Sequence, residues 1–420
     1  MPVRREEVLE VLMRGLAAAD PEGAVRRRAS RLGAASLRVL AFGKAACRMA
    51  SGAAAALGDR VEEGLVIVPR GYPCGDLGDM RILEGTHPLP SPENVRASEE
   101  ARGLVGRVRE DEVLLVLISG GGSALLEVPK EGVGVEEEAA LVGELMRRGA
   151  DVREINAVRK HLSEVKGGQL LRGFRGRACV SLIVSDVVGN PIDAIASGPT
   201  APDPTTYSDA LGVLRRYGLL ERFPGAARLL ERGARGELGE TLKPGDPVFS
   251  RVVNEVVLDN RPALAAAAAA ARGLGYRAQV LTDSMEGEAR EVGRFLGSLA
   301  ARGARRAQLA GGETTVTVLG GGRGGRNQEL ALGAALQVRR LGMAARAGVG
   351  ALATDGVDGN SPAAGAALGS EDIASMDEDG ARAALRESDS YGFLGRAGLA
   401  VVTGPTGTNV NDLAVVLVRG

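Results

Sequence analysis

The sequence predicts an α/β protein with two α/β domains, the first built on a doubly wound parallel sheet and the second smaller. Three observations predict this class. The chain has 420 residues, which is too long for one hydrophobic core and suggests about two domains. Short apolar runs alternate with helical patterns along the whole length, as in parallel sheets covered by helices. The runs of the first half are largely continuous apolar runs, as expected of strands that are buried on both faces.

Each element follows from its local pattern. The first half has predicted strands at 37–42, 65–68, 113–118 and 180–185, and predicted helices at 44–57, 91–108, 135–148 and 155–171. The second half has predicted strands at 252–258, 277–282, 307–309, 314–319, 348–353, 399–402 and 413–418, and predicted helices at 262–272, 286–302, 327–341 and 378–388. A loop rich in Pro, Asp and Thr at 200–206, followed by a polar stretch at 232–246, predicts domains at 1–240 and 241–420.

Composition narrows the classes of partner. The 52 basic residues almost cancel the 53 acidic ones, and the chain has five tyrosines, six phenylalanines and no tryptophan. Without a global positive charge or many stacking side chains, no nucleic-acid partner is expected. No stretch reaches the roughly 20 apolar residues of a membrane helix, so no membrane partner is expected either. The composition favours a small-molecule ligand.

The cysteines bear on the compartment. Cys47, Cys74 and Cys179 stand singly, without CxxC spacing. This pattern argues against a disulfide framework and against a structural zinc site, and it predicts a cytoplasmic protein.

Lysine is scarce, since only five of the 52 basic residues are lysines. A lysine in this chain is therefore expected to serve a particular geometry. Lys44 lies at the turn from the first strand into a helix, where open α/β sheets collect anionic ligands. The turn is not a Walker A motif, which needs glycine in place of Arg38 and serine or threonine in place of Ala45. A surface lysine in the first turn of a helix is the alternative interpretation.

A glycine-rich loop follows the predicted strand at 113–118. It consists of Ser119, Gly120, Gly121, Gly122 and Ser123. Consecutive glycines let backbone N–H groups converge on phosphate oxygens, and the serines add hydroxyl donors. The alternative is a tight strand-to-helix turn.

A third motif follows the predicted strand at 180–185. Asp186 ends this strand, and Asn190, Gly198 and Thr200 come close behind. The carboxylate of Asp186 is suited to magnesium, which prefers oxygen ligands and keeps several waters at nucleotide sites. A helix cap is the alternative role for Asp186.

The second half carries further candidates. The glycines at 320–325 formally satisfy GxGxxG, but no acidic residue lies about 20 positions on, so a dinucleotide site is not expected. Arg326 can grip a carboxylate or a phosphate with its planar fork, and Arg323 is a second candidate nearby. Asp355 and Asp358 lie in a glycine-rich turn that suits a second face of one cleft or an exposed turn.

Two histidines are present, His87 and His161. They are too few for a three-histidine zinc site, and no Ser-His-Asp order is evident. His161 stands beside Arg159, Lys160 and Lys166 on a predicted helix, and this cluster either faces phosphates or forms a solvated helix face.

Taken together, the motifs resemble one family. The residues that carry the resemblance are Phe42 to Ala46, Ser119 to Ser123, Lys160 to Ser163 with Lys166 to Gly168, Ser185 to Val187 with Ser197 to Thr200, Gly325 to Glu329, Thr354 to Gly359, and Asn409 to Asp412. In this order they resemble the glycerate 2-kinase family, also called type II glycerate kinases, whose carboxyl-terminal part is the MOFRL domain. The resemblance covers nearly the whole chain.

The resemblance implies transfer of the γ-phosphoryl group of ATP to the 2-hydroxyl of D-glycerate, giving 2-phosphoglycerate, with a divalent metal. It also implies a Rossmann-like first domain and an active site in the cleft between the domains. The key lysine and arginine of the family correspond to Lys44 and Arg326. Proteins similar to this family were often labelled hydroxypyruvate reductases, so an NAD(P)H-dependent reductase is one alternative, and a non-catalytic nucleotide-binding protein is another.

These inferences give a set of expected site residues. ATP is assigned to Ser119, Gly120, Gly121, Gly122, Ser123, Asp186, Asn190, Gly198 and Thr200; Mg²⁺ is assigned to Asp186; and D-glycerate is assigned to Lys44, Arg326, Asp355 and Asp358. We expect Lys44 and Arg326 to be catalytic and to face each other across the cleft. The sequence does not decide whether Arg323 shares the role of Arg326, and a homodimer is compatible with it.

Overall fold

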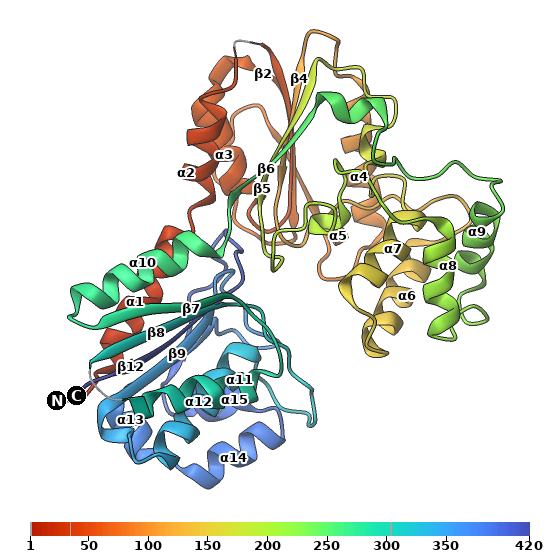
Figure 1. The fold of residues 1–420 in the computed structure, drawn as a ribbon. Coiled ribbons are helices and arrows are strands. Elements are labelled where there is room, and N and C mark those ends of the chain that lie inside the picture. Colours follow the sequence, from red (N-terminus) through yellow and green to blue (C-terminus); the bar gives the residue numbers. More distant parts are fainter. Residues whose placement is uncertain (1, 34, 303–304) are drawn as a thin grey trace. The chain divides into compact units, whose positions relative to one another are not determined.

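The computed structural model describes residues 2–33, 35–302 and 305–420. The chain forms two compact units, coloured along the sequence in Figure 1. The central unit is Pro21–Val257, and the terminal unit combines Met1–Asp20 with Leu258–Gly420. No helix in the described ranges is long and apolar enough to cross a membrane.

The central unit contains a six-stranded sheet in its described part, with the order β3-β2-β1-β4-β5-β6. Its strands are β1 (Leu37–Phe42), β2 (Val61–Pro69), β3 (Arg81–Gly85), β4 (Val113–Ile118), β5 (Ala178–Val184) and β6 (Val252–Leu258). β1 pairs in parallel with both β2 and β4. The chain builds the sheet outward from β1 in one direction and then from β4 in the other, so the carboxyl ends of β1 and β4 form a topological switch point.

Some helices of this unit cover the sheet, and others form a group beside it. They are α2 (Pro21–Ala29), α3 (Ala46–Leu57), α4 (Pro92–Gly106), α5 (Gly122–Leu125), α6 (Val135–Arg147), α7 (Val152–Leu162), α8 (Tyr207–Arg216) and α9 (Pro224–Ala234), with 3-10 turns at Gly58–Arg60, Gln169–Leu171, Ile195–Ser197 and Pro247–Arg251. The helices α6 to α9 share a hydrophobic core distinct from that of the sheet, and Figure 1 shows them as a separate group within this unit. The predicted helix at 155–171 ends at Leu162 instead, because the chain turns there to pair Ser163 with Pro129.

The terminal unit contains a second six-stranded sheet in its described part, with the order β11-β10-β9-β12-β8-β7. Its strands are β7 (Arg277–Met285), β8 (Arg306–Gly312), β9 (Ala347–Ala353), β10 (Gly365–Leu368), β11 (Ala400–Val401) and β12 (Asp412–Val418). β12 runs antiparallel to both β8 and β9, so the expectation of parallel sheets along the whole chain is wrong for this unit. Alternation of strands and helices does not reveal that the last strand inserts between two earlier ones.

The helices of the terminal unit come from both ends of the chain. They are α1 (Arg5–Ala18), α10 (Asn260–Gly273), α11 (Ala289–Ser298), α12 (Arg326–Arg340), α13 (Ser370–Ser375), α14 (Glu378–Arg386) and α15 (Ser390–Arg396), with 3-10 turns at Leu299–Arg302 and Ala344–Arg346. The predicted strand at 314–319 is absent: the segment is a largely exposed loop with a single bridge between Glu288 and Thr315.

The observed division differs from the predicted domains 1–240 and 241–420 at two places. β6 joins the central sheet beside β5, so the central unit continues to Val257. At the other end of the chain, α1 belongs to the terminal unit. Its buried Glu7 accepts hydrogen bonds from Tyr276 Oη at 2.6 Å and from Arg419 Nη2 at 2.8 Å.

Candidate active site

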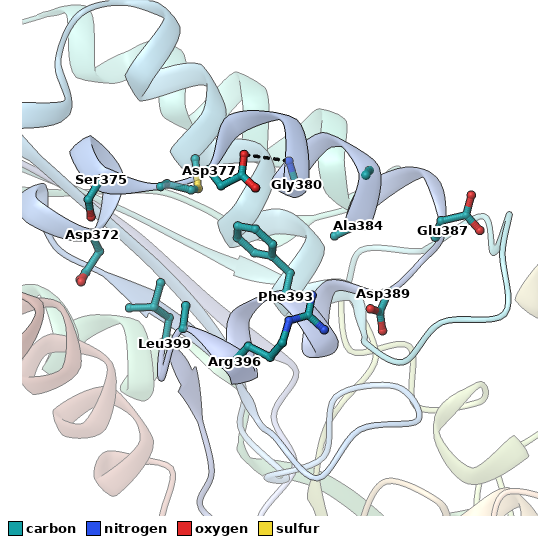
Figure 2. A pocket seen from close by; sticks show the side chains of 13 residues that line it. Asp372, Ser375, Asp377, Gly380, Ala384, Glu387, Asp389, Phe393, Arg396 and Leu399 are labelled. Carbon is teal, nitrogen blue, oxygen red and sulfur yellow. Dashed lines mark hydrogen bonds between the residues drawn. The ribbon is translucent and has the colours of Figure 1, made fainter.

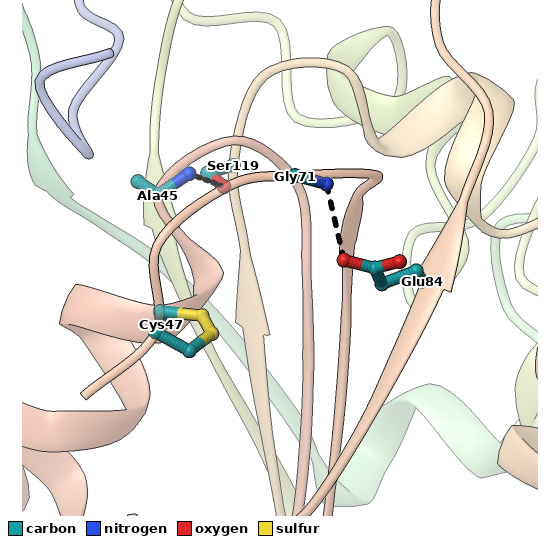
Figure 3. Close-up of a disulfide and its surroundings, with 6 residues drawn as sticks. Ala45, Cys47, Gly71, Glu84 and Ser119 are labelled. Carbon is teal, nitrogen blue, oxygen red and sulfur yellow. Dashed lines mark hydrogen bonds between the residues drawn. A yellow bond between two sulfur atoms is a disulfide. The ribbon is translucent and has the colours of Figure 1, made fainter. Parts of the chain in front are cut away.

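The turn after β1 and the loop after β4 are joined at the switch point of the central sheet. The backbone N–H of Lys44 donates to the carbonyl of Gly120 at 2.8 Å, and the N–H of Ala45 donates to Ser119 Oγ at 3.1 Å (Figure 3). Gly43 has a φ of 118°, and a Cβ there would overlap the side chain of Ser119. The contact therefore requires glycine at position 43, and it places the half-buried Lys44 beside the glycine-rich loop.

The loop residues differ in what they can offer a ligand. Ser119 is fully buried, and its hydroxyl is committed to Ala45 and to the carbonyl of Phe42, so it does not add the donor that the sequence suggested. Gly121 is half-buried and has a φ of 82°. Ser123 is also half-buried, and its Oγ lies 3.1 Å from Ser197 Oγ. Gly121 and Ser123 are thus the members of the loop with partly open surfaces.

The motif after β5 is only partly open. Asp186 lies just after β5, which ends at Val184, and Asn190 follows in the same loop; both are half-buried. Thr200 is buried, and its hydroxyl bonds Asn254 Oδ1 at 2.7 Å and Ser181 Oγ at 2.9 Å. Gly198 is buried too, and a Cβ there would meet the backbone of Asp193 at 2.8 Å. Gly198 and Thr200 therefore shape the interior in this structure.

Asp186 suits a magnesium ion that is bound together with a nucleotide, and not a metal ion held by protein ligands alone. Within the described ranges, no group of three or more His, Cys, Asp or Glu side chains is arranged to hold a metal ion. A single carboxylate such as Asp186 is nevertheless enough for magnesium at a nucleotide site, where phosphate oxygens and waters supply the other ligands.

The cationic cluster around His161 lies in the interior, so both sequence interpretations of it are wrong. Lys160 is 2% exposed and pairs with Asp193 at 3.2 Å and Asp203 at 3.3 Å. His161 is fully buried, and its Nε2 lies 3.1 Å from Glu240 Oε2. Although burial opposes ionisation, hydrogen bonds from His161 and from the backbone of Tyr207 lower the pKa of Glu240 to about 2. The cluster ties α7 to the loops that precede α8 and follow α9.

Arg326 begins α12 in the terminal unit. Its Nε and Nη2 donate to the two oxygens of Asp412 at 2.6 and 3.0 Å, and its Nη1 lies 2.9 Å from Glu313 Oε1. Burial opposes the charge, but the carboxylate of Asp412 raises the pKa of Arg326 above its ordinary value. The side chain remains 27% exposed, so the fork is fixed in direction while part of it stays accessible. A cavity of about 500 Å³ lies beside it, lined in part by Glu313 and Glu329.

The other expected residues of this unit have different surroundings. Asp358 is 1% exposed, and its carboxylate accepts the backbone N–H groups of Asn327 and Gln328 at 3.0 Å as well as both of their side-chain amides. Burial raises the pKa of Asp358 to about 6. This carboxylate caps the start of α12 and thereby orients Arg326. Asp355 is also buried and accepts the N–H of Val357 at 3.0 Å.

Arg323 has different partners from Arg326. Its guanidinium carbon lies 5.4 Å from the centre of the Tyr391 ring, and its backbone N–H donates to Asp389 Oδ1 at 3.1 Å. The stacking on Tyr391 gives Arg323 a local partner of its own, in contrast to Arg326 with its bidentate carboxylate.

Sequence reasoning missed two features of these sites. Asp412 was part of a recognised motif, but nothing in its spacing linked it to Arg326, 86 positions earlier. The sequence suggests no role for His87, because two histidines are too few for a zinc site. In the structure its ring lies against Gly121. The available signal was its position after a strand, β3, which was itself not predicted.

Two further features stand outside the expected residues. Cys47 and Cys74 form a disulfide, with Cα atoms 5.3 Å apart, near the Ala45–Ser119 contact (Figure 3). The inference from single cysteines against disulfides is therefore wrong for this pair, whose 27-residue separation carries no recognisable spacing. A cavity of about 600 Å³ on α13 to α15 is lined by Asp372, Asp377, Glu387, Asp389 and Arg396, among others (Figure 2). It contains none of the expected site residues.

Comparisons with known proteins agree with this architecture. Residues 7–231 match the family described as a domain of unknown function (DUF4147), and residues 306–412 match the MOFRL family. A protein of Pyrococcus horikoshii named glycerate 2-kinase is 41% identical, over 90% of this chain and 87% of its own. A protein of Agrobacterium vitis, provisionally named a hydroxypyruvate reductase, is 37% identical over 99% of this chain and 94% of its own. A crystal structure of glycerate kinase from Thermotoga maritima superposes with a TM-score of 0.86 at 36% identity and covers 99% of both chains.

Proposed function

We propose that this chain, which belongs to the glycerate 2-kinase family, transfers the γ-phosphoryl group of ATP to the 2-hydroxyl of D-glycerate. The observation that carries the proposal is the junction of Lys44 with the glycine-rich loop at the switch point of the central sheet. Ligands of open α/β sheets bind at such points, and backbone N–H groups with a lysine there suit phosphates.

In the proposed mechanism the protein positions the reactants and stabilises charge. The phosphates of ATP lie against Gly121 and Ser123, and the Lys44 ammonium binds the transferring group. The hydroxyl oxygen of glycerate attacks phosphorus, the bond to the β-phosphate oxygen breaks, and the hydroxyl proton leaves to solvent. Such a reaction needs little covalent chemistry from the enzyme and gains most from aligned cations.

Arg326 supplies the second cation in this proposal. Asp412 holds Nε and Nη2, and Nη1 lies beside Glu313, so the remaining N–H groups of Nη1 and Nη2 are the ones available to the carboxylate or phosphoryl oxygens of the substrate. Asp412 and Asp358 are positioning residues, since both carboxylates are used within the protein. That Lys44 and Arg326 face each other stays a prediction.

Asp186 is the proposed magnesium ligand. A magnesium ion bound there would neutralise charge on two adjacent phosphates of the nucleotide. Asn190 and Asp355 remain proposed contacts for nucleotide and glycerate, respectively. Asn190 follows Asp186 along the chain, and Asp355 precedes Asp358, which caps the helix of Arg326.

A hydroxypyruvate reductase is the second candidate, favoured by the name of the Agrobacterium relative. The fold argues against it, because the described residues 313–319, which lie between β8 and the GxGxxG segment at 320–325, form no strand, and the dinucleotide fingerprint requires a strand directly before the glycines. Two assays on the same preparation decide between the functions: ADP release with ATP and D-glycerate, and NADH or NADPH oxidation with hydroxypyruvate. Reduction without phosphorylation would overturn the proposal, and nucleotide binding without either reaction would indicate a binding protein.

A further inference from the structure

The imidazole of His87 lies against the glycine-rich loop of the central unit. A Cβ placed on Gly121 would be 3.0 Å from Cδ2 and 3.1 Å from Nε2 of His87, and 3.4 Å from Cγ of Lys44. The ring and the lysine stem therefore flank one point above Gly121. His87 is exposed, so this position is open to a ligand from solvent.

A buried asparagine fixes the segment that carries His87. Asn94 is fully buried in α4, and its Oδ1 accepts the N–H of Thr86 at 2.9 Å. Its Nδ2 donates to the carbonyl of Thr86 and to that of Ala124, each at 2.9 Å. Ala124 belongs to α5, the helix that continues the glycine-rich loop. One side chain thus ties the residue before His87 to the loop that its ring contacts.

We propose that His87 is a further phosphate-binding residue, whose Nε2–H donates to an oxygen of the nucleotide phosphates that lie against Gly121 and Lys44. The inference deepens the proposed function, on which it rests, by adding a third group to the phosphate site. Histidine suits this position because its ring nitrogen donates a directed hydrogen bond and, when protonated, adds a positive charge. The ring is exposed, and its segment is already fixed through Asn94, so the ring is held in place beside the loop.

The test measures ADP binding to the full chain by isothermal titration calorimetry, with His87→Ala, His87→Gln and Leu89→Ala. Leu89 is an exposed side chain in the same segment and serves as the matched control. A hydrogen bond to a charged group is worth enough that His87→Ala should weaken ADP binding by roughly tenfold or more. His87→Gln should recover part of the loss, because its amide N–H can still donate, and Leu89→Ala should bind ADP as the unaltered chain does.

Activity separates this inference from the proposed function. If the unaltered chain binds ADP in a manner that depends on His87 but does not phosphorylate D-glycerate, the phosphate-site inference stands and the proposed function fails. Equal ADP affinity in His87→Ala and the unaltered chain overturns the inference. It is also overturned if His87→Ala raises only the KM for D-glycerate, since His87 would then serve the acceptor.

Discussion

Replacement of Gly121 by alanine tests the phosphate loop directly. With φ at 82° and ψ at −6°, Gly121 lies in the left-handed region, where an L-residue costs about 1–2 kcal/mol. The new methyl group would lie 3.0 Å from the ring of His87 and 3.4 Å from the stem of Lys44. It would fill the point that we assign to phosphate. We expect the apparent KM for ATP to rise roughly tenfold or more, about 1.4 kcal/mol in binding free energy, while the KM for D-glycerate changes little.

Gly132→Ala is the matched control. Gly132 also has a positive φ, 93°, and lies in the same unit, but a Cβ there meets nothing within 4 Å. Both variants therefore bear a similar backbone cost, and both should lower the free energy of unfolding by a similar amount in denaturant titrations. Only Gly121→Ala should alter ATP kinetics. Equal KM values for ATP in the two variants, or a change confined to D-glycerate, would refute the assignment of this loop to nucleotide phosphates.

Three further predictions follow from the charged residues. Lys44→Ala and Arg326→Ala should each lower kcat by roughly a hundredfold or more with the fold intact by circular dichroism, because each removes a cation from the transition state; near-normal turnover would remove that residue from the mechanism. Asp186→Asn should need much more magnesium for half-maximal activity, and an unchanged magnesium titration would place the metal elsewhere. Burial raises the pKa of Glu329 to about 7 from its ordinary 4.5. Stability from its protonated form is then full below about pH 4.5 and lost as the pH rises to about 7, so Glu329→Gln should flatten the fall in the free energy of unfolding over that window. An unaltered pH dependence in this variant would show that Glu329 ionises normally in the folded chain.

The central site could be predicted because its signals are local. β1 and β4 have the bounds that the sequence predicts. β4 is an unbroken apolar run that ends before Ser119, and β1 is apolar except for Arg38 and ends before Gly43. Their neighbouring positions follow from the general behaviour of doubly wound sheets. By contrast, β3 is short and mostly exposed, so it lacks the apolar run that marks the other strands, and the position of His87 after it could not be inferred.

The terminal site depends on pairings that local patterns do not carry. Asp358 and Asp412 both stand in polar, glycine-rich sequence, which is equally typical of exposed turns. In the structure both are almost fully buried, one at the start of α12 and the other on the Arg326 fork. The difference arises from the antiparallel insertion of β12 between β8 and β9, which brings residue 412 beside residues 312 and 353. A sheet assumed to be parallel would not make this contact.

The scarcity of lysine leads to a narrower conclusion than it first suggests. Four of the five lysines make buried or partly buried polar contacts in the central unit: Lys130 with Tyr207, Lys160 with Asp203, Lys166 with Glu127 and Lys243 with Glu240. The geometry that these lysines serve is structural: Lys130, Lys160 and Lys166 are buried, and a compact ammonium fits interior sites that a wide guanidinium does not. Rarity alone therefore does not make Lys44 catalytic. What distinguishes Lys44 is its place at the strand switch point, with its backbone bonded to the glycine-rich loop and its side chain beside Gly121. The case for its role depends on that place, and the Lys44→Ala and Gly121→Ala variants both test it.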